Sequence, residues 1–304
     1  MKNYILKNNT LIIFILLLFV SSILSDSFLT ITNISNLLRQ VAPIGLVSIG
    51  MFLVILTGGI DLSVGSILAF IGVVFALLSY EVYYPVALLL SIIFGILCGV
   101  ISGYLVAYQY IASFIATLAM MTIVRGGGFL LSKGAPITVG EHSSSILTLA
   151  NGTFLGIPYS AIILFVSFGI VYVLLKYHVY GRKVIALGSN EEAVRLSGIN
   201  VKQIKMSVYV LAALLTTIAA LLMVGRTGVG TPNVGVGMEL DAIAAVVIGG
   251  ASLSGGKGTV FHTLLGVFIL GMIGNIMNLL DVTSYLQQLI KGVIIILAVI
   301  FQKR

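Results

Sequence analysis

The charged side chains of this sequence are concentrated in one internal segment, residues 176–207. Six of the 16 Lys and Arg residues lie there, on both sides of the acidic pair Glu191 and Glu192. Long apolar stretches flank the segment, so these charges are placed to form ion pairs and hydrogen bonds with a partner in water. The chemistry predicted for this segment is docking and not catalysis.

A short helix is predicted inside this segment, over residues 190–197. Ser189 and Glu192 have the spacing of a capping box, in which each side chain satisfies a free backbone N–H group at a helix start. Gly198 follows the predicted helix, and glycine is the residue that most often ends one. These signals predict a compact helical element in the largest polar loop.

The predicted helix also has favourable charges. Acidic residues fall in its first turn and a basic residue in its last, which complements the helix dipole. Glu191 and Arg195 are four residues apart, in the favoured order for an ion pair on one helix face. The helix and its flanking residues are Ser189, Asn190, Glu191, Glu192, Ala193, Val194, Arg195, Leu196, Ser197 and Gly198.

Five polar residues in or beside apolar stretches are further candidates: Asp61, Ser63, Asp241, Asn275 and Asn278. Charged residues at membrane depth are costly, and they mark a transport pathway or a bond between helices. The Asp61 carboxylate or Ser63 would suit the cap of a following helix. Asn275 and Asn278 are spaced to share one helix face, where amides would suit a neutral polyhydroxylated substrate or another helix. Both alternatives stay open for this set.

Catalytic and nucleotide-binding motifs are not found. The glycine-rich segment 249–258 departs from the phosphate-binding loop G-x-x-x-x-G-K-[ST] at Ala251 and at Gly258; it is instead typical of a tight turn where helices approach closely. The three histidines are scattered, with no H-E-x-x-H pattern. We therefore expect no enzyme activity, metal or cofactor in this chain.

The composition places these residues in a membrane protein. Hydrophobic residues make up 59% of the chain and charged residues 8%, against about 25% charged in soluble domains. A membrane β-barrel would show short alternating segments, whereas this chain has long apolar runs. We expect an all-α polytopic protein in one domain, residues 1–304, with about ten membrane helices. The runs are residues 11–26, 41–56, 66–80, 85–105, 111–124, 158–175, 208–224, 240–254, 260–280 and 287–301.

Several of these runs are shorter than the ~20 residues that a perpendicular membrane helix needs, so short or broken segments are expected. The first run is expected to be an uncleaved span, because no small-residue cleavage site follows it. With the N-terminus inside, the inner loops carry 11 Lys and Arg residues and the outer loops 5. The positive-inside rule then predicts that both termini and the segment 176–207 are cytoplasmic. The net charge of +7 reflects this topology and does not indicate nucleic-acid binding.

One weak internal similarity relates residues 59–65 to residues 250–256, which share the pattern G-x-x-L-S-x-G. Each follows an apolar run rich in β-branched residues. The similarity is consistent with two parallel repeats or with a chance likeness of two glycine-rich turns.

Four stretches resemble the permease subunits of ribose-type ABC sugar importers, in order and through nearly the whole chain. They are LVILTGGIDLSVGS at 53–66, FIATLAMMTIVRG at 114–126, ALGSNEEAVRLSGINVKQIK at 186–205 and LDAIAAVVIGGASLSGGKGT at 240–259. Gly58 departs from the serine expected in such a permease, and the loop 127–157 is divergent.

The resemblance implies a pore-forming subunit in a bacterial cytoplasmic (inner) membrane that moves ribose or a related monosaccharide inward. It implies a second permease copy, an ABC ATPase that holds ATP and Mg²⁺, and an extracytoplasmic sugar-binding protein. It also implies that residues 176–207 contain the coupling helix to the ATPase. Alternatives are a xylose, galactoside, autoinducer-type furanose or nucleoside permease. An ion-coupled secondary transporter, which usually has buried carboxylate or His relays, and a channel are further alternatives.

Overall fold

The computed structural model describes residues 9–141 and 145–302, and these residues form a predominantly helical structure. The helices are α2 (Asn9–Leu24), α3 (Ile31–Leu56), α4 (Val64–Glu81), α5 (Tyr84–Ala107), α6 (Ser113–Ser132), α7 (Ser145–Asn151), α8 (Tyr159–Tyr177), α9 (Val179–Ser189), α10 (Glu191–Leu196), α11 (Val201–Thr227), α12 (Met238–Ile248), α13 (Val260–Leu279) and α14 (Ser284–Gln302). Two antiparallel strand pairs join β1 (Ile137–Thr138) to β4 (Val229–Gly230), and β2 (Thr153–Phe154) to β3 (Ile157–Pro158).

Each of the ten predicted apolar runs contains one helix, which confirms the all-α polytopic fold. Among the described residues, seven helices are long and apolar enough to cross a membrane: α3, α4, α5, α6, α8, α11 and α13. The runs at either end of the chain hold α2 and α14. The count of about ten spans was loose, because α12 has only 11 residues. At ~1.5 Å per residue it is too short for a hydrocarbon layer of about 30 Å.

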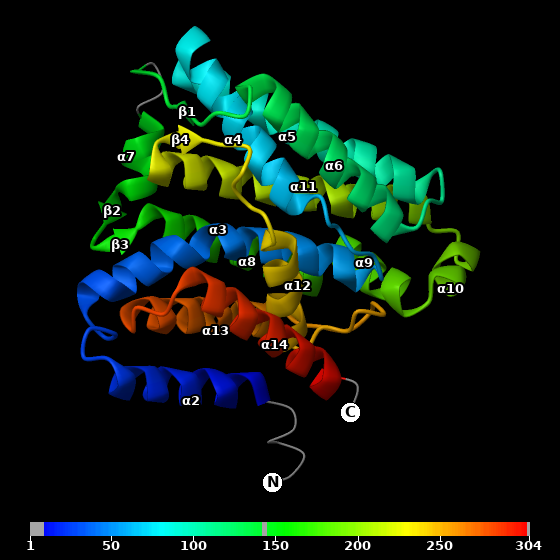
Figure 1. The fold of residues 1–304 in the computed structure, drawn as a ribbon. Helices are drawn as coiled ribbons and strands as arrows, with labels where there is room; N and C mark the ends of the chain where they lie inside the picture. Colours follow the sequence, from blue (N-terminus) through cyan, green and yellow to red (C-terminus); the bar gives the residue numbers. More distant parts are fainter. Residues whose placement is uncertain (1–8, 142–144, 303–304) are drawn as a thin grey trace.

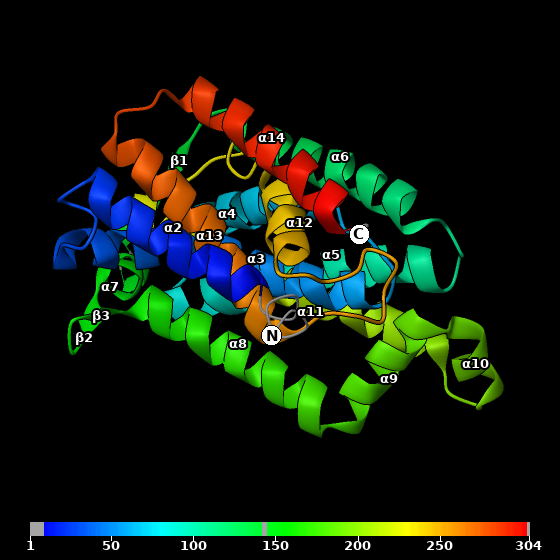
Figure 2. The same ribbon diagram turned by 90° about the horizontal axis from the view of Figure 1, so that it is seen from below.

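The core of the structure is built on α3, α4 and α11. In each of these helices at least 72% of the most apolar 18-residue stretch is buried, whereas the share is 28–39% in α5, α6 and α8. Phe52 of α3 and Tyr209 of α11 are among the largest fully buried side chains. Figures 1 and 2 show α3 in the middle of the structure, and Figure 1 shows α5 and α6 on one side of it and α2, α13 and α14 on the other. The less buried helices α5, α6 and α8 therefore have apolar surface left for lipid.

Small residues allow α5 to approach α11 closely. Gly95, Gly99 and Gly103 recur every fourth residue and lie on one face of α5. A Cβ atom on Gly99 would lie 2.7 Å from the Cβ of Ala213, and one on Gly103 would lie 2.9 Å from the carbonyl oxygen of Met206. Because lipid gives helices no hydrophobic reason to associate, such close backbone contact is a main source of their packing energy.

The broken segment of the chain includes α12. Figure 1 shows α12 running across the direction of its neighbours, between the side that holds α4 and α11 and the side that holds α13 and α14. Residues 231–237 before it and residues 249–259 after it are not helical. Irregular backbone at membrane depth is tolerated where protein or a water-filled cavity surrounds it. The predicted broken segment is confirmed here.

The short helix α10 and the β2–β3 hairpin mark opposite ends of the structure. Figure 1 shows α10 at one end and the β2–β3 hairpin at the opposite end. In the same view the first turn of α2 and the last turn of α14 are directed toward the end that holds α10. Lys2, Lys7, Lys303 and Arg304, which support the predicted cytoplasmic location of the termini, lie outside the described residues.

Candidate functional site

The polar segment 176–207 forms two consecutive short helices, α9 and α10, followed by the first turns of α11. The sequence predicted only the second of these helices. The α9 helix begins after His178, whose Nδ1 atom accepts a hydrogen bond from the backbone N–H of Tyr180 at 3.1 Å. Leu187 of α9, Val194 of α10 and Val201 of α11 are buried together in a small apolar cluster. The three helices are thus packed as one unit. We call residues 176–207 the coupling loop, after the role that the family resemblance implies for them.

The start of α10 differs from the predicted capping box. Asn190 is the N-cap residue, and its side-chain oxygen accepts a hydrogen bond from the backbone N–H of Ala193 at 3.0 Å. Ser189 is the last residue of α9, so its hydroxyl instead donates to the carbonyl oxygen of Ile185 at 3.0 Å. The capping box with Ser189 was therefore wrong, and the helix spans Glu191–Leu196. Gly198 has a φ of +75°, which confirms it as the residue that ends the helix.

The ion pairs of α10 also differ from the prediction. Arg195 pairs with Glu192 at 2.7 Å, and Glu191 pairs with Lys205 of α11 at 2.6 Å. The predicted pair of Glu191 with Arg195 was wrong, because Glu191 is turned toward α11. The hydrogen bond that Arg195 donates to the Glu192 carboxylate raises the pKa of the Arg195 guanidinium above its ordinary value. The Glu191 pair ties α10 to α11, whereas Glu192 and Arg195 remain on the exposed side of α10.

A cavity of about 510 Å³ lies beside α10. It is lined by Ala107, Tyr110, Glu191, Glu192, Arg195, Ile199, Asn200, Val201, Lys202 and Lys205. The Lys202 ammonium group lies 4.9 Å from the centre of the Tyr110 ring and 5.5 Å from that of Tyr108, within the range of a cation–π contact. Charges of both signs and an aromatic edge suit docking of a protein partner.

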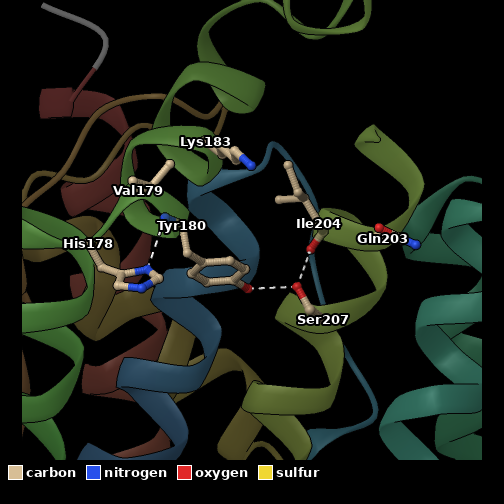
Figure 3. A pocket seen from close by; sticks show the side chains of 7 residues that line it. All are labelled: His178, Val179, Tyr180, Lys183, Gln203, Ile204 and Ser207. Atoms are coloured by element: carbon tan, nitrogen blue, oxygen red, sulfur yellow. Dashed lines mark hydrogen bonds between the residues drawn. The ribbon is translucent and has the colours of Figure 1, made fainter. Parts of the chain in front are cut away.

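A second cavity of about 360 Å³ separates the start of α9 from the start of α11. Figure 3 shows its lining residues: His178, Val179, Tyr180, Lys183, Gln203, Ile204 and Ser207. The hydroxyls of Tyr180 and Ser207, at its wall, are 2.7 Å apart, and Ser207 also donates to the carbonyl oxygen of Ile204 at 2.8 Å. Burial raises the pKa of Tyr180, which keeps it a neutral hydrogen-bonding group. These bonds fix α9 to α11.

The end of α9 meets the end of α3 and the loop before α13 in a glycine junction, formed by Leu56, Gly58, Gly188, Gly255 and Gly256. The backbone N–H of Gly256 donates to the carbonyl oxygen of Leu56 at 2.9 Å. A Cβ atom on Gly188 would collide with that same carbonyl oxygen, and one on Gly255 would lie 2.9 Å from the Gly58 nitrogen. The segment 249–258 is therefore the close-packing turn that the sequence predicted, and it joins the coupling loop to the core.

Asp61 and Ser63 form the turn that begins α4. One carboxylate oxygen of Asp61 accepts hydrogen bonds from the backbone N–H of Ser63 at 2.9 Å and from its hydroxyl at 2.5 Å. Asp61 is only 1% exposed and Ser63 is fully buried. The predicted cap is not formed, because Ser63 is the N-cap residue of α4 and makes no side-chain capping hydrogen bond; Asp61 instead closes the turn just before the helix.

Asn275 and Asn278 contact different neighbours, although their spacing predicted a shared face. Asn275 is buried and exchanges two side-chain amide hydrogen bonds with Asn33 of α3, both at 2.9 Å. Asn278 is exposed and accepts a hydrogen bond from Gln287 of α14 at 2.8 Å. Asn275 therefore bonds α13 to α3, whereas Asn278 bonds α13 to α14.

Asp241 belongs to the same region as Asn278. It lies in the first turn of α12, and one of its carboxylate oxygens is 3.0 Å from the ammonium nitrogen of Lys291 in α14. The structure thus brings Asp241 and Asn278 to one hollow but leaves Asp61 and Asn275 elsewhere. Lys291 and Gln287 were missed as site residues, although both are polar residues in or beside an apolar run and that signal was available.

Arg125 is a further residue whose role was missed. It lies inside α6, and one of its guanidinium nitrogens donates to the carbonyl oxygens of Pro232 and Val234 at 2.7 and 2.6 Å. Irregular backbone has carbonyl groups without helical partners, and Arg125 supplies donors to two of them. The side chain therefore holds the broken segment before α12 in place.

The chain matches the family model described as the branched-chain amino acid transport system / permease component over residues 33–299. This chain belongs to that permease family. The permease is 47% identical to the ribose import permease protein of Bacillus subtilis (strain 168), over 96% of this chain and 91% of the relative. It is 42% identical to the ribose import permease protein of Escherichia coli (strain K12), over 100% of this chain and 95% of the relative.

A third relative is the L-arabinose transport system permease protein of Escherichia coli (strain K12), which is 36% identical over 96% of this permease and 89% of that protein. No solved structure matches the permease. Its relatives are permease subunits, which are not themselves enzymes. Within residues 9–141 and 145–302, no group of three or more His, Cys, Asp or Glu side chains is placed to hold a metal ion.

Proposed function

We propose that this permease forms the transmembrane pathway of an ATP-binding-cassette importer that moves ribose or a closely related monosaccharide into the cytoplasm. The observation that carries the proposal is its similarity, along its whole length, to ribose import permeases of two distant bacteria, at 47% and 42% identity. The coupling loop adds a structural argument, because an importer without an ATPase has no use for a charged docking element tied to its core.

The ATPase docks on α10 in this proposal. The exposed Glu192 and Arg195 and the mixed-charge cavity beside them supply the contacts. When the ATPase closes on ATP, it displaces α9 and α10 together, because their apolar residues are packed as one unit. The glycine junction passes that displacement to α3 and to the loop before α13. No chemical step takes place in the permease itself.

The proposed orientation places α10 in the cytoplasm and the β2–β3 hairpin outside, where a sugar-binding protein delivers its cargo. The excess of Lys and Arg in the predicted inner loops supports it. The first turn of α2 and the last turn of α14 are both directed toward the end that holds α10 (Figure 1), which supports a cytoplasmic side common to these three elements. Two copies of the permease enclose the pathway, one against the other.

Substrate identity is tested by transport competition. The permease, its ATPase and its binding protein are reconstituted in liposomes, and ATP-dependent uptake of radiolabelled ribose is measured against excess unlabelled ribose, L-arabinose, xylose or galactose. We expect ribose to compete best, and arabinose to compete weakly. Uptake of ribose that is absent while another of these sugars is accumulated would assign the permease to that sugar instead.

A further inference from the structure

Five polar side chains converge on one hollow of about 200 Å³ between α3, α12, α13 and α14. We call this the polar hollow; its polar residues are Gln40, Asp241, Asn278, Gln287 and Lys291. Asp241 is paired with Lys291 at 3.0 Å, and Asn278 with Gln287 at 2.8 Å. The remaining lining is apolar or glycine. Mostly apolar walls with a few converging polar groups are typical of a small-molecule site.

The polar hollow lies at membrane depth. Lys291 comes seven residues after the start of α14 and Gln40 nine residues after the start of α3, which places them about 10 and 14 Å along their helices. A hydrocarbon layer is about 30 Å thick. The side chains of Lys291 and Asp241 are nevertheless 33% and 29% exposed. Charges exposed at this depth face water or protein and not lipid.

The hollow is on the half of the permease away from the coupling loop. The loop before α13 touches Gly188 and Leu56 at the coupling end, so α13 runs from there toward the opposite end. Asn278 is in the last turn of α13, and Gln287 is in the first turn of α14. On the proposed orientation the hollow belongs to the outer half, where a sugar released by the binding protein would enter.

The polar groups of the hollow have hydrogen-bonding capacity left over. Among the described residues, the second carboxylate oxygen of Asp241 and the amide of Gln40 have no side-chain hydrogen bond, and the Lys291 ammonium uses one donor of three. The Asp241–Lys291 pair has no net charge. Such a set attracts a neutral ligand with many hydroxyl groups and gives no advantage to an anion or a cation.

We propose that the polar hollow is a sugar-contacting station in the outer half of the pathway, where the hydroxyls of a monosaccharide bond to Asp241, Lys291 and Gln40 in passing. The inference rests on the proposed function, and it names the residues that would replace water around the sugar at membrane depth. A buried polar ligand without such partners would incur a large cost of desolvation. Weak contacts at this station keep the sugar moving.

A steric substitution tests the station without removing any polar group. Gly274 of α13 lines the hollow, and a Cβ atom there would meet nothing within 4 Å. Gly169 of α8 is likewise an open position in a helix and serves as the matched control. The valine side chain would occupy the hollow and keep the sugar from the bonding groups that remain there. We therefore expect Gly274→Val to reduce ATP-driven uptake per assembled complex by at least about tenfold, the size of effect seen when a substrate loses its polar partners, and Gly169→Val to leave it unchanged. Normal uptake by the Gly274→Val complex would overturn the proposal.

A second arm tests the same hollow even where Gly274→Val fails to assemble. Cys98, the single cysteine of the chain, is first replaced by alanine. In this Cys98→Ala background, single cysteines replace Gln287 in the hollow or Leu289, a 68% exposed apolar residue two positions along α14. A membrane-impermeant thiol reagent should modify position 287 at least about tenfold faster, because thiolate forms readily only in contact with water, and it should block uptake. Equal rates at 287 and 289, or modification of 287 without loss of uptake, would overturn the station.

The two proposals fail in distinguishable ways. If the parent complex moves no sugar of any kind with its ATPase and binding protein, the proposed function fails. Fast modification of position 287 would then still assign a water-filled hollow, but the sugar contact would be overturned with the function.

Discussion

The backbone N–H of Gly256 donates a hydrogen bond to the carbonyl oxygen of Leu56 at 2.9 Å, although 200 residues separate them in the sequence. That carbonyl belongs to the last turn of α3 and has no partner further along the helix. Gly188, at the end of α9, lies against the same two groups so closely that no side chain fits there. The central helix α3 and the loop before α13 are therefore both in contact with the coupling loop.

Gly188→Ala is expected to uncouple ATP hydrolysis from transport. An added Cβ collides with the Leu56 carbonyl oxygen and the Gly256 nitrogen, both of which are backbone atoms that cannot turn away. We expect uptake to fall by an order of magnitude or more while the ATPase still associates, since misplacement by about 1 Å has effects of that size. Uptake and hydrolysis are measured on the same complexes. Gly169→Ala, in open space, is the control and should behave like the parent; equal behaviour of both variants would contradict the junction.

Asn190→Ala is expected to weaken binding of the ATPase more than Ser189→Ala does. Asn190 caps α10, and loss of an N-cap costs about 0.5–2 kcal/mol of helix stability. The Ser189 hydroxyl only bonds back to Ile185 within α9. Affinity of the purified permease for its ATPase, measured by titration, checks the order. A larger effect of Ser189→Ala would support the capping box that the structure replaces.

The sequence was sufficient to predict ten apolar helices, because backbone groups in an apolar run have no water to bond to and are satisfied within a helix. It did not show that one of them, α12, is too short to cross the membrane. The short helix α10 could also be located from the sequence, because its end at Gly198 depends on a local backbone preference of glycine. The partners of its charges could not. Glu191 finds Lys205 rather than Arg195 because α10 packs against α11, which is a tertiary fact. The prediction that Asn275 and Asn278 share one environment was wrong for the same reason, because α3 packs against Asn275 and α14 against Asn278.

Asn275→Leu is expected to lower the thermal stability and yield of the permease but not the uptake per assembled complex. The substitution removes both side-chain hydrogen bonds between Asn33 and Asn275 and leaves the Asn33 amide only its bond to the carbonyl oxygen of Phe28. Interhelical hydrogen bonds in membranes contribute about 0.6–2 kcal/mol. Unfolding in detergent followed by heating measures the loss. Asn33→Leu combined with Asn275→Leu should recover part of it. If Asn275→Leu instead keeps full stability and slows uptake, Asn275 contacts the substrate.

The orientation is tested with single cysteines at Ser189 and Leu155 in a Cys98→Ala background. Ser189 ends α9, and Leu155 is an 88% exposed residue of the turn between β2 and β3, at the opposite end of the structure. In intact cells a membrane-impermeant thiol reagent should label position 155 and not position 189. Lysed cells, in which both positions should react, are the control. Labelling of position 189 from outside would reverse the proposed topology.

The central claim is that a separate ATPase on the cytoplasmic side drives sugar through this permease by way of the coupling loop. Uptake in liposomes of defined content tests it most directly. Vesicles that contain the permease, its ATPase and its binding protein should accumulate labelled ribose above the outside concentration only when ATP is present on the side that holds α10. Vesicles that contain the permease alone should accumulate none. Accumulation by the permease alone, driven by an ion gradient or without any energy source, would contradict the account.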